Sequence, residues 1–317
     1  MGENESHYRA RLEPVSAKAK GLAAAATATA LLILSGCGQG AADASGKLQV
    51  VAAENVWGSI AEQLGGDRVE VTSIVTNPAS DPHDYEPTSA DARAMAGARL
   101  AIVNGIGYDS WASRLLAANP TPGRVTLDVG DLLGLAAGDN PHQWYSPAAV
   151  RRVAGAISAN YRKLEPGRSA YFARRRAAFE TKALARYRRL LAQIRRRYAG
   201  KPVGASESIF APLASTLGLR LVTPSGFLDA ISQGTEPTPA EKATVDRQIA
   251  TRRIAVWAYN PQNATPDIQR LNDAARATGI PIATVTETLV PADASFESWQ
   301  VRELEGLRAA LAKAAAR

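Results

Sequence analysis

Hydrophobic residues from residue 47 onward follow two alternating patterns. Short runs rich in β-branched residues, such as residues 48–53 and 69–75, are typical of buried strands. Between them, residues 56–64 repeat apolar side chains at helical spacing and end at Gly65 and Gly66, which stop a helix. This succession of strand, helix and strand predicts a parallel sheet that helices cover on both faces.

The same alternation occurs in two halves of the chain. In the first half it predicts strands at residues 48–53, 69–75, 100–104 and 125–128, and helices at residues 56–64, 88–96 and 110–118. In the second half it predicts strands at residues 201–205, 219–222, 254–259 and 282–285, and helices at residues 209–217, 239–250, 265–277 and 296–315. The sequence therefore predicts an α/β protein with two doubly wound parallel-sheet lobes.

Two helical stretches, residues 147–164 and 169–198, separate these halves. The second carries apolar residues on one side and arginines on the others, and at 1.5 Å per residue it would extend about 45 Å. That length favours a long rigid helix that joins the two lobes as a strut. A helix hairpin packed on one domain is the alternative.

Residues 1–37 have the features of a signal peptide. Basic residues precede an apolar stretch at residues 21–34, and the sequence LSGC at residues 34–37 closes it. This ending resembles a bacterial lipobox, in which a peptidase cuts before the cysteine and the thiol, here Cys37, then carries lipid. An incidental cysteine is the alternative. Cys37 is the only cysteine, which excludes an intramolecular disulfide and a thiolate-rich metal site.

These features divide the chain into five predicted parts. They are a lipoprotein signal peptide at residues 1–37, a flexible tether at 38–46, an N-terminal α/β lobe at 47–146, linking helices at 147–199 and a C-terminal α/β lobe at 200–317. The tether assignment follows from the glycine, alanine and serine content of residues 38–46.

The chain is basic, with a formal charge of +7. Much of this surplus lies between residues 174–176 and residues 195–197, each of which is a run of three arginines, and such a pattern is typical of a solvated helix face. No nucleic-acid-binding motif accompanies these residues, so we do not expect nucleic acid as a partner.

Two of the three histidines, His83 and His142, lie in similarly built loops, each directly after a proline. Pro82 and Pro141 fix the backbone φ at about −65° and stiffen the loop where the ring must be aimed. Neutral imidazole is the commonest protein ligand of divalent transition metals, so the pair predicts half of a metal site. A structural histidine with no metal is the alternative for each.

Several stretches together resemble one family. The lipobox and residues 81–87, 104–111 and 140–144, which read DPHDYEP, NGIGYDSW and NPHQW, are similar to the metal-binding solute-binding lipoproteins of bacterial zinc and manganese ABC importers. The resemblance covers nearly all of residues 48–311. It implies two α/β lobes joined by one long helix, with a single ion bound in the cleft by two residues from each lobe.

The resemblance also implies the ligands. His83 and His142 match the histidines of the first lobe, Glu207 stands where zinc-importing members usually carry a histidine, and Glu287 matches an acidic residue after the last strand. Manganese-type members similarly carry a glutamate at the third position. For Glu287, a carboxylate that stabilises a helix N-terminus is the alternative.

The four implied ligands indicate which metal the site favours. Two imidazoles and two carboxylates favour manganese or iron(II), although the Irving–Williams order leaves zinc open. The histidine-rich loop of many zinc-type members is also missing at residues 133–138. Because imidazole must be neutral to bind metal, we expect the affinity to weaken as pH falls through about 6.5.

The resemblance implies a binding protein rather than an enzyme. We expect an exported monomer, held by lipid on Cys37 at the outer face of the cell membrane, that delivers one ion to a permease with a cytoplasmic ATPase. A lipid-anchored metal-dependent hydrolase is the alternative from another class, because two histidines and a carboxylate can activate water. An adhesion or scaffolding lipoprotein, without a specific metal, is a third.

Overall fold

The computed structural model describes residues 46–78, 82 and 85–316, and residues 41–317 form one compact unit. Several predicted features lie outside the described residues. They are the signal peptide, the predicted lipidation site Cys37, nearly all of the tether, and His83. Among the residues that are described, none of the helices is both long enough and apolar enough to cross a bilayer.

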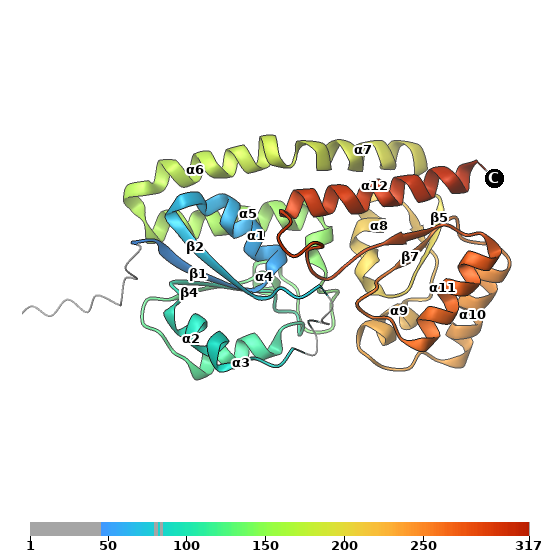
Figure 1. The fold of residues 1–317 in the computed structure, drawn as a ribbon, viewed down its shortest axis with the longest axis horizontal. Helices are drawn as coiled ribbons and strands as arrows, with labels where there is room; N and C mark the ends of the chain where they lie inside the picture. The colour runs from blue at the N-terminus through green and yellow to red at the C-terminus, as the bar shows by residue number, and fades with distance from the viewer. Residues whose placement is uncertain (1–45, 79–81, 83–84, 317) are drawn as a thin grey trace, which may run out of the picture. The chain divides into compact units, whose positions relative to one another are not determined.

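The N-terminal lobe contains a parallel sheet with the strand order β2-β1-β3-β4. Figure 1 shows α2 and α3 below this sheet and α1 above it, and buried side chains form a separate core on each face. The strands are β1 (Leu48–Glu54), β2 (Val69–Val75), β3 (Leu100–Val103) and β4 (Val125–Asp128), and the helices are α1 (Asn55–Gly65), α2 (Ser89–Gly97), α3 (Ser110–Ala118) and α4 (Val129–Leu133).

The C-terminal lobe repeats this arrangement with the order β6-β5-β7-β8, again with all neighbours parallel. The predicted fold class, two doubly wound parallel-sheet lobes, is confirmed. The strands are β5 (Pro202–Ala205), β6 (Arg220–Leu221), β7 (Trp257–Tyr259) and β8 (Ile282–Thr284), and the helices are α8 (Ala211–Leu217), α9 (Ser225–Ser232), α10 (Pro239–Ala250), α11 (Pro266–Thr278) and α12 (Phe296–Ala315).

Helix starts follow local capping chemistry. Thr88 and Asp91 form the predicted capping box of α2, in which each side chain bonds to the backbone N–H of the other residue. Thr238 and Glu241 do the same for α10. The sequence analysis missed α4 and α9, because each is at most eight residues long and has a glycine among its first two positions.

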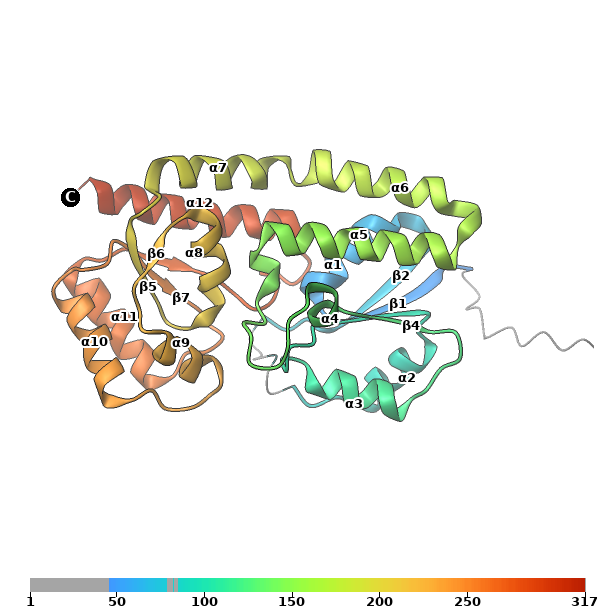
Figure 2. The same cartoon turned by 180° about the vertical axis from the view of Figure 1, so that it is seen from behind.

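The predicted long helix is divided into segments. It follows α5 (Pro147–Leu164) and consists of α6 (Ser169–Ala178), a π-helical turn (Phe179–Ala183) and α7 (Ala185–Tyr198), so the predicted helical stretch at residues 169–198 is present, with a π turn between its two α-helical segments. Helix α6 packs against α5 and α1, whereas α7 packs against α8 and α12 (Figure 2). One half thus pairs with α5 on the N-terminal lobe while the other half lies on the C-terminal lobe, as a strut requires.

The lobes also meet through the C-terminal segment. Hydrogen bonds run from the N–H of Phe296 to Ser59 Oγ at 2.9 Å and from Gln63 Nε2 to Glu297 Oε2 at 2.8 Å. The N–H of Leu289 donates to Asn55 Oδ1 at 3.2 Å. Helix α12 and the loop before it therefore hold the two lobes together beside the strut.

Candidate metal centre

His142 lies in the loop that follows α4, and its side chain is fully buried. Its ring packs edge-on against Trp144, with centroids 5.4 Å apart, and its Nδ1 lies 3.0 Å from Asn140 Oδ1. An Nδ1–H that donates to this amide oxygen leaves the lone pair on Nε2. A metal-binding histidine needs this tautomer and this fixed orientation.

Glu207 lies two positions after β5, at the carboxyl end of this strand, and is 1% exposed. Both carboxylate oxygens accept amide hydrogen bonds, Oε1 from Asn260 Nδ2 and Oε2 from Asn263 Nδ2 at 2.9 Å. Burial and then the charge of Glu287 raise the pKa of Glu207 to about 8. The fold thus holds Glu207 where its charge is costly unless a cation compensates it.

Glu287 follows β8 and faces the N-terminal lobe. Its Oε2 lies 3.3 Å from His142 Nε2 and accepts a hydrogen bond from the Tyr108 hydroxyl at 2.7 Å. Its backbone N–H donates to Gln262 Oε1 at 2.5 Å. Both His142 and Tyr108 belong to the other lobe, so the buried Glu287 carboxylate lies at the junction of the two lobes.

Asn260 connects the two glutamates. Its single amide nitrogen donates to Glu207 Oε1 and also to Glu287 Oε1, at 3.1 Å for the second bond. Its own Oδ1 accepts the N–H of Gln262 at 3.0 Å, which fixes the orientation of the amide. Two carboxylates that would repel each other in an apolar interior are therefore held side by side by one donor group.

The structure brings together three of the four predicted site residues, namely His142, Glu207 and Glu287. The fourth, His83, lies outside the described residues. Within the ranges that are described, no three His, Cys, Asp or Glu side chains come close enough together to enclose a metal ion by themselves. The arrangement is one imidazole and two carboxylates gathered at the lobe junction.

A network of buried hydrogen bonds holds the loop that carries His142 in place. Asn104, at the end of β3, donates to the carbonyl of Pro141 at 3.1 Å and accepts from Trp57 Nε1 at 2.9 Å. Asp109 fixes the turn after β3, because its carboxylate accepts the N–H groups of Asn104 and Gly105 at 2.7 and 2.8 Å. This turn carries Tyr108, the phenol that reaches Glu287.

A second interlobe contact lies just behind the site. The Tyr145 hydroxyl is buried and donates to Glu303 Oε2 at 2.6 Å, while it accepts the N–H of Thr286 at 3.0 Å. Tyr145 is three residues after His142 and Thr286 is the neighbour of Glu287. The phenol therefore fixes the separation of two loops that carry predicted ligands.

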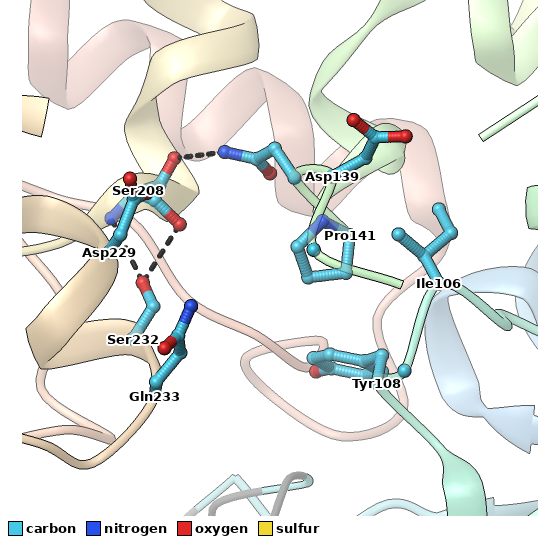
Figure 3. Close-up of a pocket in the computed structure, with 11 residues that line it drawn as sticks. Ile106, Tyr108, Asp139, Pro141, Ser208, Asp229, Ser232 and Gln233 are labelled. Carbon is cyan, nitrogen blue, oxygen red and sulfur yellow. Dashed lines mark hydrogen bonds between the residues drawn. The ribbon is translucent and has the colours of Figure 1, made fainter. Parts of the chain in front are cut away.

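A pocket of about 350 Å³ opens beside the site (Figure 3). In the figure the Ser208 carbonyl accepts a hydrogen bond from the Asn140 side chain, at 2.8 Å, which links the two walls of the pocket. The exposed carboxylates of Asp139 and Asp229 belong to opposite walls and make the opening attractive to a cation. The lining residues are Ile106, Gly107, Tyr108, Gly138, Asp139, Asn140 and Pro141 of the first lobe, and Ser208, Asp229, Ser232 and Gln233 of the second.

The sequence analysis missed the amides around the carboxylates. Asn260, Gln262 and Asn263 directly follow β7, where loops from the carboxyl ends of parallel strands meet, so their position after a predicted strand was the available signal. All five tryptophans are buried and serve as packing residues, namely Trp57, Trp111, Trp144, Trp257 and Trp299.

Comparison with known families gives a match over most of the chain. Residues 50–310 match the model of the family described as the periplasmic component A of a zinc-uptake complex. The metal ABC transporter substrate-binding lipoprotein FimA of Streptococcus parasanguinis is 27% identical over 266 residues, which cover 78% of this chain and 83% of FimA. The manganese ABC transporter substrate-binding lipoprotein PsaA of Streptococcus pneumoniae is 25% identical over 238 residues, covering 70% of this chain and 75% of PsaA.

Solved structures show the same fold. A manganese-bound mutant of a periplasmic metal-binding protein from Candidatus Liberibacter asiaticus superposes with a TM-score of 0.71 at 19% identity, covering 84% of this chain and all of that one. The periplasmic zinc-binding protein TroA of Treponema pallidum superposes with a TM-score of 0.69 at 19% identity, covering 84% of this chain and 99% of TroA.

Proposed function

The chain belongs to the family of periplasmic zinc-uptake complex components, and on this basis we propose that it captures divalent transition metal ions for an ABC importer. Members of this family are binding components of transporters, not enzymes, so the hydrolase hypothesis is not supported. The ion is cargo: it enters the cleft, is held between the lobes and leaves to a membrane permease that a cytoplasmic ATPase drives.

The proposed ligands are His83, His142, Glu207 and Glu287. One observation carries the proposal: the 3.3 Å separation of His142 Nε2 and Glu287 Oε2, which joins a buried imidazole of one lobe to a buried carboxylate of the other. Glu287 is buried and joined through Asn260 to the buried Glu207, and two neighbouring buried carboxylates are costly unless a cation is paired with them. A cation between them supplies that pairing.

Capture follows from this division of ligands. Each lobe alone offers only part of a coordination shell, so a bound ion favours the arrangement in which the lobes are together. The Tyr145 contact and the strut limit how far the lobes can separate. We therefore propose a small opening movement that exposes the ligands, with Asp139 and Asp229 attracting the ion to the pocket.

For the cargo we propose manganese or iron(II), with zinc as a competitor. Both glutamates supply hard oxygen donors, and two oxygens with two nitrogens suit these ions better than a nitrogen-rich set does. Relatives are named for each metal: PsaA for manganese, YfeA of Yersinia pestis for iron, and TroA for zinc.

We further propose that the protein is an exported monomer. Cleavage before Cys37 and lipidation of its thiol would anchor the mature chain at the outer face of the membrane, with residues 38–46 as tether. The lobe boundaries at residues 47–146 and 200–317, with linking helices at 147–199, remain part of this proposal.

Elemental analysis and calorimetry test the function. Protein purified without added ions should contain about one divalent metal per chain, and after chelation it should bind manganese, iron(II) or zinc with one-site stoichiometry. His142→Ala should weaken this binding about 10- to 100-fold while the fold, followed by circular dichroism, is retained. A wild-type protein that binds none of these ions would contradict the proposal, and turnover of generic esters would revive the hydrolase alternative.

A further inference from the structure

The helices of the strut carry most of the positive charge of the molecule. Residues 169–198 contain nine arginines and one lysine against a single glutamate, a net charge of +9, whereas the whole chain carries +7. The rest of the chain is thus slightly acidic, at −2. A charge distribution this uneven creates a strong local field on one face of the protein.

These basic side chains point into solvent. We call the exposed ones the basic face; its members are Arg174, Lys182, Arg186, Arg188, Arg189, Arg195, Arg196 and Arg197. Only Arg186 among them forms a salt bridge, with Glu305 at 2.6 Å, within the part of the chain that the structure describes. Most of the positive charge of the basic face is therefore not neutralised by neighbouring carboxylates.

On α7, two arginines of the basic face share the side away from the core. Arg189 and Arg196 are seven residues apart, two helical turns, and lie opposite the buried positions Leu190, Leu191 and Ile194. Figures 1 and 2 show α6 and α7 as an outermost layer, with α5 and α12 beneath them. No other described element covers their outer side in either view.

The chain enters the folded unit next to this layer. The first strand begins at Leu48, which pairs with Val69, and the turn before Val69 holds Asp67, whose carboxylate accepts the Tyr171 hydroxyl of α6 at 2.5 Å. Residues 38–46 can span at most about 30 Å when fully extended. A lipid on Cys37 would therefore keep the α6 end of the basic face close to the membrane surface.

We propose that the basic face docks on anionic phospholipid headgroups, so that α6 and α7 lie along the membrane. The inference rests on the proposed lipid anchor for the closeness of the membrane, and a tether of this length would add a high local concentration to the attraction that the basic face provides by itself. Unpaired arginines close to an anionic bilayer are attracted to it within about one Debye length, roughly 10 Å at 0.1 M salt.

Docking through the basic face leaves the pocket beside the metal centre open to the medium. Helix α9, which contributes Asp229 and Ser232 to the pocket, lies at the bottom of Figures 1 and 2, whereas α6 and α7 lie at the top. The docked protein thus collects ions with its pocket facing away from the bilayer. Delivery to a permease then requires the basic face to detach, which its electrostatic character permits.

Sedimentation with vesicles tests the proposal on the compact unit from residue 41, which carries no lipid. We expect binding to vesicles of equal parts phosphatidylglycerol and phosphatidylcholine at about 0.05 M salt, loss of binding at about 0.5 M salt, and no binding to pure phosphatidylcholine. Replacing Arg174, Arg189, Arg196 and Arg197 by Gln should lower the vesicle affinity at least about tenfold.

A matched control removes the same charge elsewhere. Arg220, Arg247, Arg252 and Arg253 are exposed on the C-terminal lobe and line a different hollow. Their replacement by Gln should leave vesicle binding within about threefold of wild type if the basic face is the docking surface. Equal losses of vesicle affinity in both variants would overturn the proposal. So would wild-type binding that is equally strong to anionic and to neutral vesicles.

Calorimetry with manganese on the same proteins separates this inference from the proposed function. The basic-face variant should bind manganese like wild type, because its four arginines are not part of the metal centre. Absence of metal binding in all the proteins would refute the transport proposal and leave the vesicle result standing, whereas normal metal binding without vesicle binding would refute only the docking proposal.

Discussion

The N-terminal lobe builds its sheet from strands of seven, seven, four and four residues, whereas the C-terminal lobe uses strands of four, two, three and three. Both lobes nevertheless have the same strand order. The parallel order, which brings the carboxyl ends of the strands and their loops to one edge, is what the site requires. Strand length is free to differ because it affects the amount of core rather than the position of the loops.

The lobes also hold their functional groups by different means. His142 of the first lobe is aimed by aromatic packing against Trp144 and by one amide, Asn140. Glu207 and Glu287 of the second lobe are held by a set of amides centred on Asn260. A neutral ring needs only orientation, whereas two buried anions also need donors that reduce their repulsion. The predictions below test this difference.

Removing a carboxylate should have the largest effect. Glu207→Ala should weaken binding of every divalent ion by more than about 100-fold, because it deletes a charged ligand, and Glu207→His should shift the preference toward zinc. Calorimetry with manganese and zinc measures both changes. Asp273→Ala, which removes an exposed carboxylate from α11, is the control. An unchanged metal profile in the Glu207 variants would show that this residue is not a ligand.

Metal affinity should also depend on pH through the protonation of Glu207 in the C-terminal lobe. The pKa of Glu207 is raised to about 8 in the metal-free protein, so a metal ion must displace a proton at neutral pH. Affinity should fall by up to about tenfold for each pH unit below about 8. This dependence begins at higher pH than histidine ligation alone implies. Titrations between about pH 6 and pH 8.5 measure it, and a flat profile would contradict the assignment.

The raised pKa of Glu207 also determines whether the stability of the metal-free fold rises or falls with pH. Because the folded pKa of Glu207 lies above its ordinary value of 4.5, this group stabilises the metal-free fold fully below about pH 4.5, and the contribution is lost as pH rises toward about 8. Glu207→Gln keeps the shape without the charge. Denaturant unfolding of the variant should therefore show a weaker decline of stability over this pH range than wild type does.

Loss of the bridging amide should have the next largest effect. Asn260→Ala should lower metal affinity about 10- to 100-fold, since it releases both carboxylates at once. Asn263→Ala is the matched control, because Asn263 hydrogen-bonds only Glu207 among the three proposed ligands that the structure describes, and a smaller loss is expected. Calorimetry compares the two. Equal effects would mean that bridging the two glutamates is not what Asn260 contributes.

The smallest effect should come from the phenol between the lobes. Tyr145→Phe removes the partner of the Thr286 N–H and should lower the free energy of unfolding by about 1–2 kcal/mol. Tyr187→Phe is the control, because the buried Tyr187 hydroxyl makes no hydrogen bond with any residue that the structure describes. Denaturant unfolding measures both variants. If Tyr187→Phe is as destabilising as Tyr145→Phe, the interlobe hydrogen bond is not the cause.

Local patterns in the sequence located most of the elements. Each predicted strand overlaps an observed one, and the helices at residues 110–118, 147–164, 239–250 and 296–315 have the predicted bounds. Periodicity and caps act over a few residues, so they can be read from the chain directly. The π turn at Phe179–Ala183 could not be, because its residues also fit a regular α-helix.

The sequence by itself determined the fold class through hydrophobic spacing, and its short motifs carried the family resemblance, which in turn implied the proposed ligands. Only the tertiary structure decided that Asn260 holds Glu207 and Glu287, which lie 53 and 27 residues away from it, and that Tyr108 reaches Glu287 across the lobes. Such contacts form where loops of distant strands converge, and local sequence carries no record of which side chains will meet there.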